Sequence, residues 1–478
     1  MINHKIVKQK KSAKAKSRPL CVDLDGTLYK GDLFLEELVV ALLERPFCVV
    51  QALTRFGGIA AMKELIHSGR EVQPAEADFR PEVVKRLREE ARRGRKIFLV
   101  TAAHESVAND VAKHLGFFTG VFSTRKDVNL KGKKKQERLL EKFGHAGYEY
   151  LGDSESDRFA MQSAYAGHWV NRITGQLQPR KAGCRLYSLT AIQPWIRLIR
   201  PHQWAKNLLV FLPLLASGQL GRTDLWVQAT LVFTAFCLVA SAGYVANDIA
   251  DVRSDRRHPE KGRRPLAAGI LTLPQGVALF FSLVALALVP MRLLDAGANL
   301  ILLGYFVLSL LYSHSLKKLP LLDIFTLSAL YLSRVVAGGF AADTRVSSWL
   351  LMFVGFDFCG MAALKRYTEL LNQEQPSPLG RRGYLAHEHD LLGQISFLAM
   401  GIAGLVLALY ARSPEAALVY RHPERMMLAG FLWFGWSTWV LLQAQRRNIQ
   451  KDPVAFCLRD KVSWICLFLM ALIYGCSK

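Results

Sequence analysis

Cysteine is scarce in this sequence. Only eight of the 478 residues are cysteine, and no two of them form a Cys-x-x-Cys pair. A secreted fold held together by disulfides is therefore excluded, and a cysteine-bound metal is not expected. Polar, disordered composition is lacking as well, because 51% of the residues are hydrophobic. That apolar content excludes an intrinsically disordered chain.

Acidic residues are outnumbered by basic ones. The sequence has 62 Lys and Arg against 39 Asp and Glu, which gives a net charge of +23. Such an excess is typical of proteins that bind nucleic acid, an anionic membrane surface or a phosphorylated substrate. No RNA- or DNA-binding motif is present, so nucleic acid is excluded as a partner. No signal-peptide core follows the basic residues 1–19, which are expected to form an N-terminal arm.

The chain divides into a soluble part and a membrane part. Residues 20–177 alternate short apolar runs with charged helical stretches, a pattern that predicts an α/β domain. An amphipathic connector is expected over residues 178–200, and residues 201–478 are expected to form an all-α membrane bundle. Uncharged runs in this last part are long enough to cross about 30 Å of hydrocarbon as helices. The nine predicted spans are residues 207–221, 226–246, 266–291, 296–316, 324–342, 346–364, 391–411, 426–445 and 462–476.

Basic residues concentrate in alternate loops of the predicted bundle. The loops after the second, fourth, sixth and eighth spans hold most of them, within residues 253–264, 317–318, 365–382 and 446–461. Since basic loops stay on the cytoplasmic side, this asymmetry predicts a multi-pass protein of the cell (inner) membrane. The N-terminal domain is then cytoplasmic, and the C-terminus lies on the outer side.

Acidic and hydroxyl side chains follow three predicted strands of the soluble domain. Asp23 and Asp25 end the first strand in the run Asp-x-Asp-Gly-Thr-Leu, and carboxylates two residues apart point the same way. A metal held by one carboxylate neutralises an incoming phosphate, and the other can protonate a leaving oxygen. Thr101 ends a second strand, and Asp153 and Asp157 follow a third.

In this order, and with a basic helical start between them, the motifs resemble the haloacid dehalogenase-like (HAD) phosphatase family. The resemblance covers about residues 18–177 and implies that Asp23 is the nucleophile and Asp25 the general acid and base. It also implies that Thr101 contacts the phosphate, and that Asp153, with support from Asp157, completes the Mg²⁺ site around Asp23.

The lysine of this motif set stays open between two positions. Lys131 fits the usual distance to Gly152 slightly better, and Lys135 is the alternative. The resemblance further implies an inserted helical cap between about residues 32 and 96, which would select the substrate. A degenerate domain retained for docking is the other interpretation, although no motif carboxylate is missing.

Three more acids lie at the inner end of the second predicted span. Asp248, Asp251 and Asp255 are spaced i, i+3 and i+7, which predicts that they share one helical face. Mutual repulsion there favours a divalent cation, and Mg²⁺ prefers carboxylate oxygens together with oxygens of a phosphate or diphosphate. Arg264 follows in a basic loop that can bind the same anion.

The acidic run, the number of spans and the Arg-Pro-Leu-Ala-Ala-Gly segment at 264–269 resemble the UbiA superfamily of intramembrane prenyltransferases, over about residues 197–478. Members carry a second Asp-x-x-x-Asp motif, but here Leu327 stands four residues after Asp323. That departure weakens a two-metal prenyl-diphosphate site. The segments 200–207, 312–317, 333–339 and 365–370 instead resemble the branch that makes decaprenyl-phosphate phosphoribose.

This branch transfers 5-phosphoribose from phosphoribosyl pyrophosphate to a polyprenyl phosphate. The resemblance implies that Mg²⁺ on Asp248 and Asp251 holds the diphosphate, while basic and polar residues hold the two substrates. The HAD domain could then dephosphorylate the product, whose 5-phosphate is a monoester. The candidate substrate-binding residues are Lys206, Asp255, Arg264, Tyr312, Lys317, Asp323, Arg334, Lys365 and Arg366.

Several alternatives remain at this point. A UbiA-type enzyme could move a prenyl group from a polyprenyl diphosphate to an aromatic or other acceptor. A phosphatase anchored by a polytopic domain and a transporter are further candidates, although a transporter would place its acids at the midplane. Arg334 and Asp357 lie within predicted spans, where they either serve a substrate or pair with each other.

Overall fold

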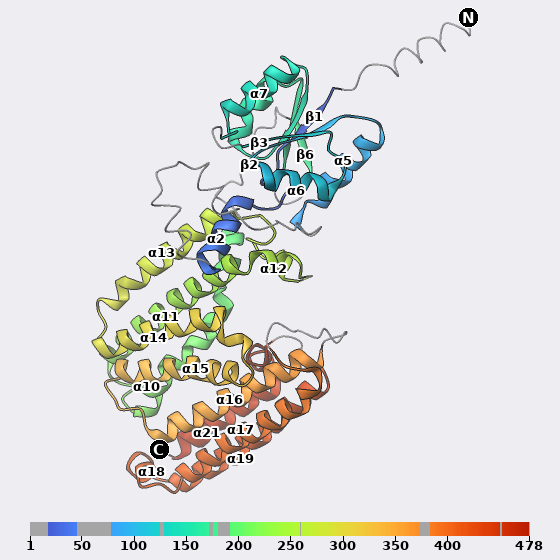
Figure 1. Cartoon of the computed structure of the whole chain (residues 1–478). Coiled ribbons are helices and arrows are strands. Elements are labelled where there is room, and N and C mark those ends of the chain that lie inside the picture. Colours follow the sequence, from blue (N-terminus) through green and yellow to red (C-terminus); the bar gives the residue numbers. More distant parts are fainter. Residues whose placement is uncertain are drawn as a thin grey trace, which may run out of the picture. The chain divides into compact units, whose positions relative to one another are not determined.

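A computed structural model describes residues 18–44, 78–124, 129–171, 175–179, 192–258, 260–372, 383–449 and 452–477 (Figure 1). Most of the predicted N-terminal arm, of the cap and of the connector lies outside these ranges, as do residues 373–382 of one basic loop. The chain divides into two compact units. The first comprises Met1–Ile199 and Asp248–Leu279, and the second comprises Arg200–Asn247 and Phe280–Lys478.

A six-stranded sheet in the order β3-β2-β1-β4-β5-β6 forms the centre of the first unit. Its strands are β1 (Leu20–Val22), β2 (Ile97–His104), β3 (Gly120–Thr124), β4 (Glu149–Gly152), β5 (Ala166–Val170) and β6 (Leu177–Pro179). The first five pair in parallel, and β6 pairs antiparallel to β5. Because the strand order reverses at β1, loops that follow β1 and β4 meet at one edge of the sheet. The predicted α/β fold is confirmed.

Helices follow most strands of this sheet. Those of the first unit are α2 (Leu33–Glu44), α5 (Pro81–Arg92), α6 (Glu105–Leu115), α7 (Lys133–Phe143), α8 (Arg158–Ser163), α9 (Ile192–Ile199) and α12 (Val252–Arg256). Short apolar strands with helical crossovers are the expected product of alternating apolar runs and amphipathic stretches.

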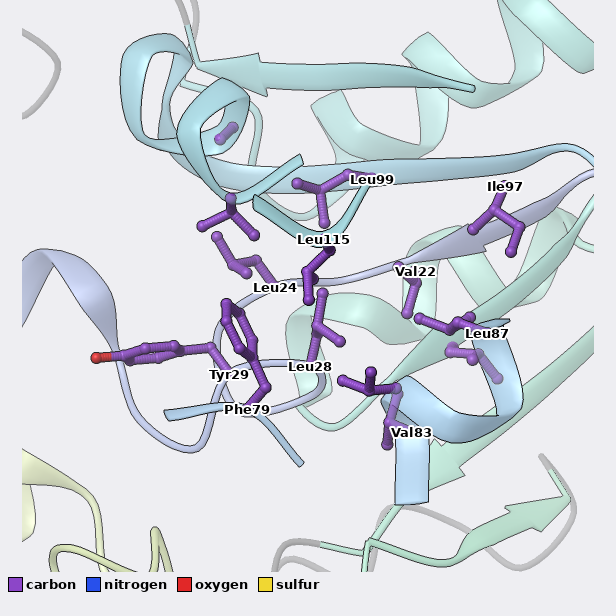
Figure 2. Packing of buried hydrophobic residues seen from close by; sticks show 14 of the residues in the cluster. Val22, Leu24, Leu28, Tyr29, Phe79, Val83, Leu87, Ile97, Leu99 and Leu115 are labelled. Carbon is purple, nitrogen blue, oxygen red and sulfur yellow. The ribbon is translucent and has the colours of Figure 1, made fainter. Parts of the chain in front are cut away.

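Helix α5 belongs to the core of the α/β domain. Its apolar residues Val83 and Leu87 are buried and pack in one cluster with Val22 and Leu24 of the first strand region (Figure 2). Phe79, just before α5, lies in the same cluster. The predicted cap of residues 32–96 therefore extends too far toward the C-terminus, because an amphipathic helix with this buried face supports the sheet.

The remaining helices comprise the long apolar helices and three short ones, α10, α18 and α20. They are α10 (Leu212–Ser217), α11 (Thr223–Ala250), α13 (Leu273–Met291), α14 (Ala296–His314), α15 (Leu322–Ala341), α16 (Ser348–Leu371), α17 (His389–Tyr410), α18 (Pro414–Val419), α19 (Met426–Gln445), α20 (Pro453–Cys457) and α21 (Lys461–Ser477). Within the second unit, α17 packs against both α16 and α19. The predicted all-α architecture of this part is confirmed.

Seven helices of the described chain are long and apolar enough to cross a membrane, so the predicted number of nine is not confirmed. The first predicted span, residues 207–221, is divided between a 3₁₀ helix (Pro201–Phe211) and the short α10. Pro213 lies in the first turn of α10, and Gly218 ends this helix in the left-handed conformation with φ 74°. The last predicted span is the apolar helix α21, which has only 17 residues.

Replacing Leu87 tests the placement of α5. Removing this fully buried side chain leaves a cavity, so we expect Leu87→Ala to lower the free energy of unfolding of the α/β domain by about 2–5 kcal/mol. The exposed Glu89→Ala on the same helix is the control and should change it by less than about 0.5 kcal/mol. Proteolysis of the detergent-solubilised full chain during heating measures both. Equal midpoint temperatures of unfolding for Leu87→Ala and Glu89→Ala would place α5 outside the core.

Candidate functional site

Three predicted acids of the α/β domain meet at the edge where β1 and β4 end. Asp23 follows β1, Asp153 follows β4, and Asp157 lies one turn further along the chain. One oxygen of each carboxylate lies within 4.8 Å of the others, and all three side chains are buried. This arrangement brings together the residues that the sequence predicts as metal ligands.

Lys135, in the first turn of α7, contacts two of these acids. Its Nζ donates to Asp23 Oδ1 at 2.9 Å and to Asp157 Oδ1 at 3.0 Å. Burial opposes ionisation of Asp157, yet the Lys135 ammonium holds the pKa of this carboxyl below its usual value. Both lysines left open by the sequence line the neighbouring cavity, and the geometry favours Lys135 as the partner of Asp23.

The turn after β1 is shaped around Asp153. Thr27 Oγ1 donates to Asp153 Oδ1 at 3.0 Å. Gly26 has φ +76°, and a Cβ at this position would overlap the Asp153 carboxylate, so the turn requires glycine. Asp25 Oδ1 accepts a hydrogen bond from the backbone N–H of Leu33, the first residue of α2, at 2.9 Å. These contacts explain why Asp25, Gly26 and Thr27 stand at their positions in the Asp-x-Asp-Gly-Thr run.

Thr101 differs from its predicted position. Strand β2 continues to His104, where it still pairs with Thr124 beyond an irregularity in the register, so Thr101 does not end the strand. Its buried hydroxyl accepts from the backbone N–H of Ala103 at 3.0 Å. A cavity of about 640 Å³ adjoins the acids, and Ala102 and Ala103 contribute to its lining.

The acidic run at the end of α11 does not lie on one continuous helix. Helix α11 ends at Ala250, and Asp251 precedes the separate helix α12, which contains Asp255. Arg264 Nη1 nevertheless bridges the run, donating to Asp248 Oδ1 at 2.9 Å and to Asp255 Oδ2 at 2.6 Å. The predicted repulsion is thus offset by an arginine. Burial raises the pKa of Asp255 even though Arg264 opposes the shift.

Arg366 of α16 joins three predicted residues of the second unit in one network. Its guanidinium donates to Asp323 Oδ2 at 2.5 Å and to the Tyr312 hydroxyl at 2.7 Å, and also to Glu369 Oε2 at 2.6 Å. The Tyr384 hydroxyl donates to the other oxygen of Asp323 at 2.5 Å. Asp323 is therefore the partner of a buried arginine.

Two predicted lysines share one carboxylate. Lys206 Nζ lies 2.9 Å and Lys365 Nζ 4.0 Å from Asp452 Oδ2. Burial opposes ionisation of Asp452, but the two lysines lower its pKa to about 2. One carboxylate between two ammonium groups leaves net positive charge at this place. Lys317, the remaining predicted lysine, donates to Asn247 Oδ1 at 3.4 Å.

Arg334 and Asp357 have different partners. Arg334 donates from Nε to Asn207 Oδ1 at 2.7 Å and from Nη2 to the Tyr305 hydroxyl at 3.1 Å. Asp357 Oδ1 accepts from Trp433 Nε1 at 3.2 Å. The predicted alternative of an ion pair between these two residues is therefore wrong for the described contacts.

Comparison with known proteins agrees with this division of the chain. Residues 207–374 match the UbiA prenyltransferase family. The decaprenyl-phosphate phosphoribosyltransferase of Mycolicibacterium smegmatis is 35% identical over 226 residues, which cover 46% of this chain and 71% of that protein. The chain belongs to the UbiA family. With seven apolar helices of spanning length, this UbiA protein is an integral membrane protein.

The N-terminal part of this UbiA protein has a second family assignment. Residues 20–162 match the haloacid dehalogenase-like hydrolases, which confirms the resemblance seen in the motifs. Protein y4nM of Sinorhizobium fredii is 32% identical over 465 residues, 95% of this chain and 89% of that protein. The nodulation protein NoeC of Azorhizobium caulinodans is 33% identical over 283 residues, 57% of this chain and 89% of that protein.

Several polar contacts of the UbiA part could not be predicted from the sequence. Asp452 is an isolated acid in a basic loop, and its lysine partner Lys206 is 246 residues away in the sequence. Tyr384 and Glu369 complete the environment of Arg366 but belong to no recognised motif. The only available signal was the position of Asp452 directly before Pro453, a helix-capping pattern.

Removing Arg366 tests whether Asp323 is a structural ion-pair partner in this UbiA bundle. Arg366→Leu leaves the buried Asp323 without its cation, so we expect a loss of about 3–5 kcal/mol in stability. The double variant Asp323→Leu/Arg366→Leu should recover part of that loss. Thermal unfolding of the detergent-solubilised chain measures it, with the exposed Arg292→Leu as control. If Arg366→Leu is as stable as this control, Asp323 is not a structural ion-pair partner of Arg366.

Proposed function

We propose that this UbiA protein transfers 5-phosphoribose from phosphoribosyl pyrophosphate to a polyprenyl phosphate, and that its HAD domain removes the 5-phosphate of the product. The main support for the first step is the similarity to a protein named decaprenyl-phosphate phosphoribosyltransferase. The second step is supported by the acid and lysine cluster around Asp23, which suits hydrolysis of a phosphate monoester.

The transferase step requires two anions to be held near each other. The lipid phosphate oxygen attacks C1 of the ribose, the bond from C1 to the diphosphate oxygen breaks, and diphosphate leaves. The carboxylates of Asp248 and Asp251 are hard oxygen donors that would hold Mg²⁺, which when bound would neutralise the departing diphosphate. Lys206, Lys317, Lys365 and Arg334 are the proposed phosphate-binding residues, because excess positive charge compensates phosphate oxygens.

The hydrolase step uses a second set of carboxylates. Asp23 and Asp153 would hold Mg²⁺, which when bound would neutralise the substrate phosphate. Asp157 has donors on both oxygens, from Lys135 and Tyr150 on one and from Ser154 on the other. Asp157 therefore orients Lys135 and the loop after β4.

Proton transfer in this step falls to Asp25. An oxygen of Asp23 attacks the phosphorus, and the ribose 5-oxygen leaves with a proton from Asp25. Water then attacks the aspartyl-phosphate and gives a proton to the Asp25 carboxylate, which releases inorganic phosphate and regenerates Asp23. The backbone hydrogen bond from Leu33 fixes the Asp25 side chain for both transfers.

The runner-up function is transfer of a prenyl group from a polyprenyl diphosphate to an aromatic or other acceptor. A two-metal site for that donor needs a second pair of acids. Asp323 is engaged on both oxygens by Arg366 and Tyr384, and Leu327 occupies the position of its expected partner. This observation favours the phosphoribosyl donor.

The proposed location follows from the distribution of basic residues. Basic residues concentrated in alternate loops, which all lie on the same side of the membrane, favour an inner-membrane protein with the HAD domain in the cytoplasm and the C-terminus outside. Both reactions then use substrates presented at the inner leaflet.

The two activities are expected to separate by mutation. Asp248→Asn should lower phosphoribosyl transfer about 100-fold or more and leave Asp23-dependent phosphate release intact. Asp23→Asn should lower phosphate release at least about 1,000-fold and leave transfer intact. Labelled phosphoribosyl pyrophosphate, with a polyprenyl diphosphate as competing donor, measures the transfer step. Phosphate release is measured separately, on phosphoribosylated polyprenyl phosphate supplied ready-made. Full transfer activity in Asp248→Asn, or a preference for the prenyl donor, would contradict the proposal.

The two lysines near Asp23 are expected to differ in effect. Lys135→Met removes the cation between two buried acids and should lower phosphate release about 100-fold or more. Lys131→Met, the matched change at the position first favoured by the sequence, should cost less than about tenfold. The rate of steady-state phosphate release with Mg²⁺ present compares the two variants. A larger loss in Lys131→Met than in Lys135→Met would make Lys131 the functional lysine.

A further inference from the structure

The cavity beside Asp23 is lined by residues from two distant parts of the chain. The α/β domain contributes the catalytic acids and the start of α2, including Phe34 and Leu35. The segment from the end of α11 to the start of α13 contributes Leu266, Leu271 and Pro274. This segment belongs to the UbiA part of the sequence, yet it lies in the same compact unit as the α/β domain.

A buried ion pair attaches this segment to the α/β domain. Arg256 of α12 donates to Glu36 of α2 through Nη2 at 2.5 Å and Nη1 at 3.0 Å, and its Nη1 also donates to the Tyr29 hydroxyl at 2.8 Å. Glu36 and Tyr29 are each 1% exposed and Arg256 is 6% exposed. Two-pronged arginine–carboxylate pairs of this kind fix orientation as well as proximity. Arg256 Nε also donates to the Ala267 carbonyl at 3.1 Å, which orders the segment itself.

Glycine permits the closest approach between the two parts. Gly269 has φ +68°, and a Cβ there would overlap the carbonyl oxygen of Lys30. Gly31 is similarly restricted, because a Cβ would overlap Glu36 Oε1 and the Arg256 guanidinium. A substitution at Gly269 therefore has to displace the segment from the α/β domain.

The cavity is lined by both charged and apolar side chains. Asp23, Asp25 and Lys135 are the charged groups at which a phosphate monoester would react. Leu266 and Leu271, both largely buried, lie on the contributed segment, and Leu273 begins α13, an apolar helix of spanning length. A ligand that matches both parts carries a phosphate monoester and an apolar chain, because apolar contact is favourable only for a substrate with apolar surface.

We infer that residues 266–274 of the UbiA part form a specificity wall of the hydrolase cavity, which selects a lipid-linked phosphate monoester over a water-soluble one. The inference rests on the proposed hydrolase function of Asp23 and adds the substrate class and the residues that select it. The hydrolase of this chain therefore depends on its own UbiA segment for specificity.

The test compares two substrates on the full-length, detergent-solubilised protein. The probes are farnesyl-phosphoryl ribose 5-phosphate and ribose 5-phosphate, and the readout is the ratio of their kcat/KM values for phosphate release. The unaltered chain should favour the farnesyl compound at least about tenfold. Gly269→Val, which displaces the wall, and Leu271→Ser, which makes it polar without a clash, should each lower the ratio about tenfold. Gly221→Ala, where a Cβ meets nothing within 4 Å, should keep it.

The outcomes distinguish failure of the specificity wall from failure of the hydrolase function. An unchanged ratio in both wall variants, or equal use of the two substrates by the unaltered chain, overturns the specificity wall. Loss of all hydrolysis in both variants also overturns it, since a wall that selects substrates leaves the Asp23 end intact. If Asp23→Asn releases phosphate as fast as the unaltered chain, or neither releases any, the hydrolase function itself fails.

Discussion

In the part of the chain that the structure describes, three groups of carboxylates are each bound by a basic side chain. Lys135 lies between Asp23 and Asp157 at the sheet edge, Arg264 bridges Asp248 of α11 and Asp255 of α12, and Arg366 binds Asp323 and Glu369. Removing a charge from water costs several kcal/mol, and the cost is offset only where geometry and hydrogen bonding are good. These cations therefore allow several acids to lie close together in buried positions.

The acids themselves were predictable because their signals are local. A short apolar strand followed at once by Asp-x-Asp-Gly-Thr identifies Asp23, and the same kind of pattern identifies Asp153. Sequence spacing did not decide whether Lys131 or Lys135 contacts Asp23, because that contact depends on where α7 begins. That helix starts at Lys133, so Lys135 lies in its first turn and Lys131 precedes it.

Errors in the sequence-based fold have equally specific causes. Helix α5 is amphipathic and charged on one face, and nothing in its own sequence tells a core helix from a cap helix; only its packing on the strands does. The 3₁₀ geometry of Pro201–Phe211 and the short α10 could not be read from hydropathy, which treats every apolar run alike. Contacts such as Arg256 to Glu36, 220 residues apart, carry no local signal at all.

The discontinuity of the first unit has a consequence for synthesis of the protein. Residues 1–199 are synthesised before α11, and residues 251–279 of the same unit are synthesised only after that helix. Domains generally begin to fold from the N-terminus while the chain is still growing. The cavity beside Asp23 can therefore be completed only after α11 has been synthesised, because residues 266–274 of its lining come later in the chain.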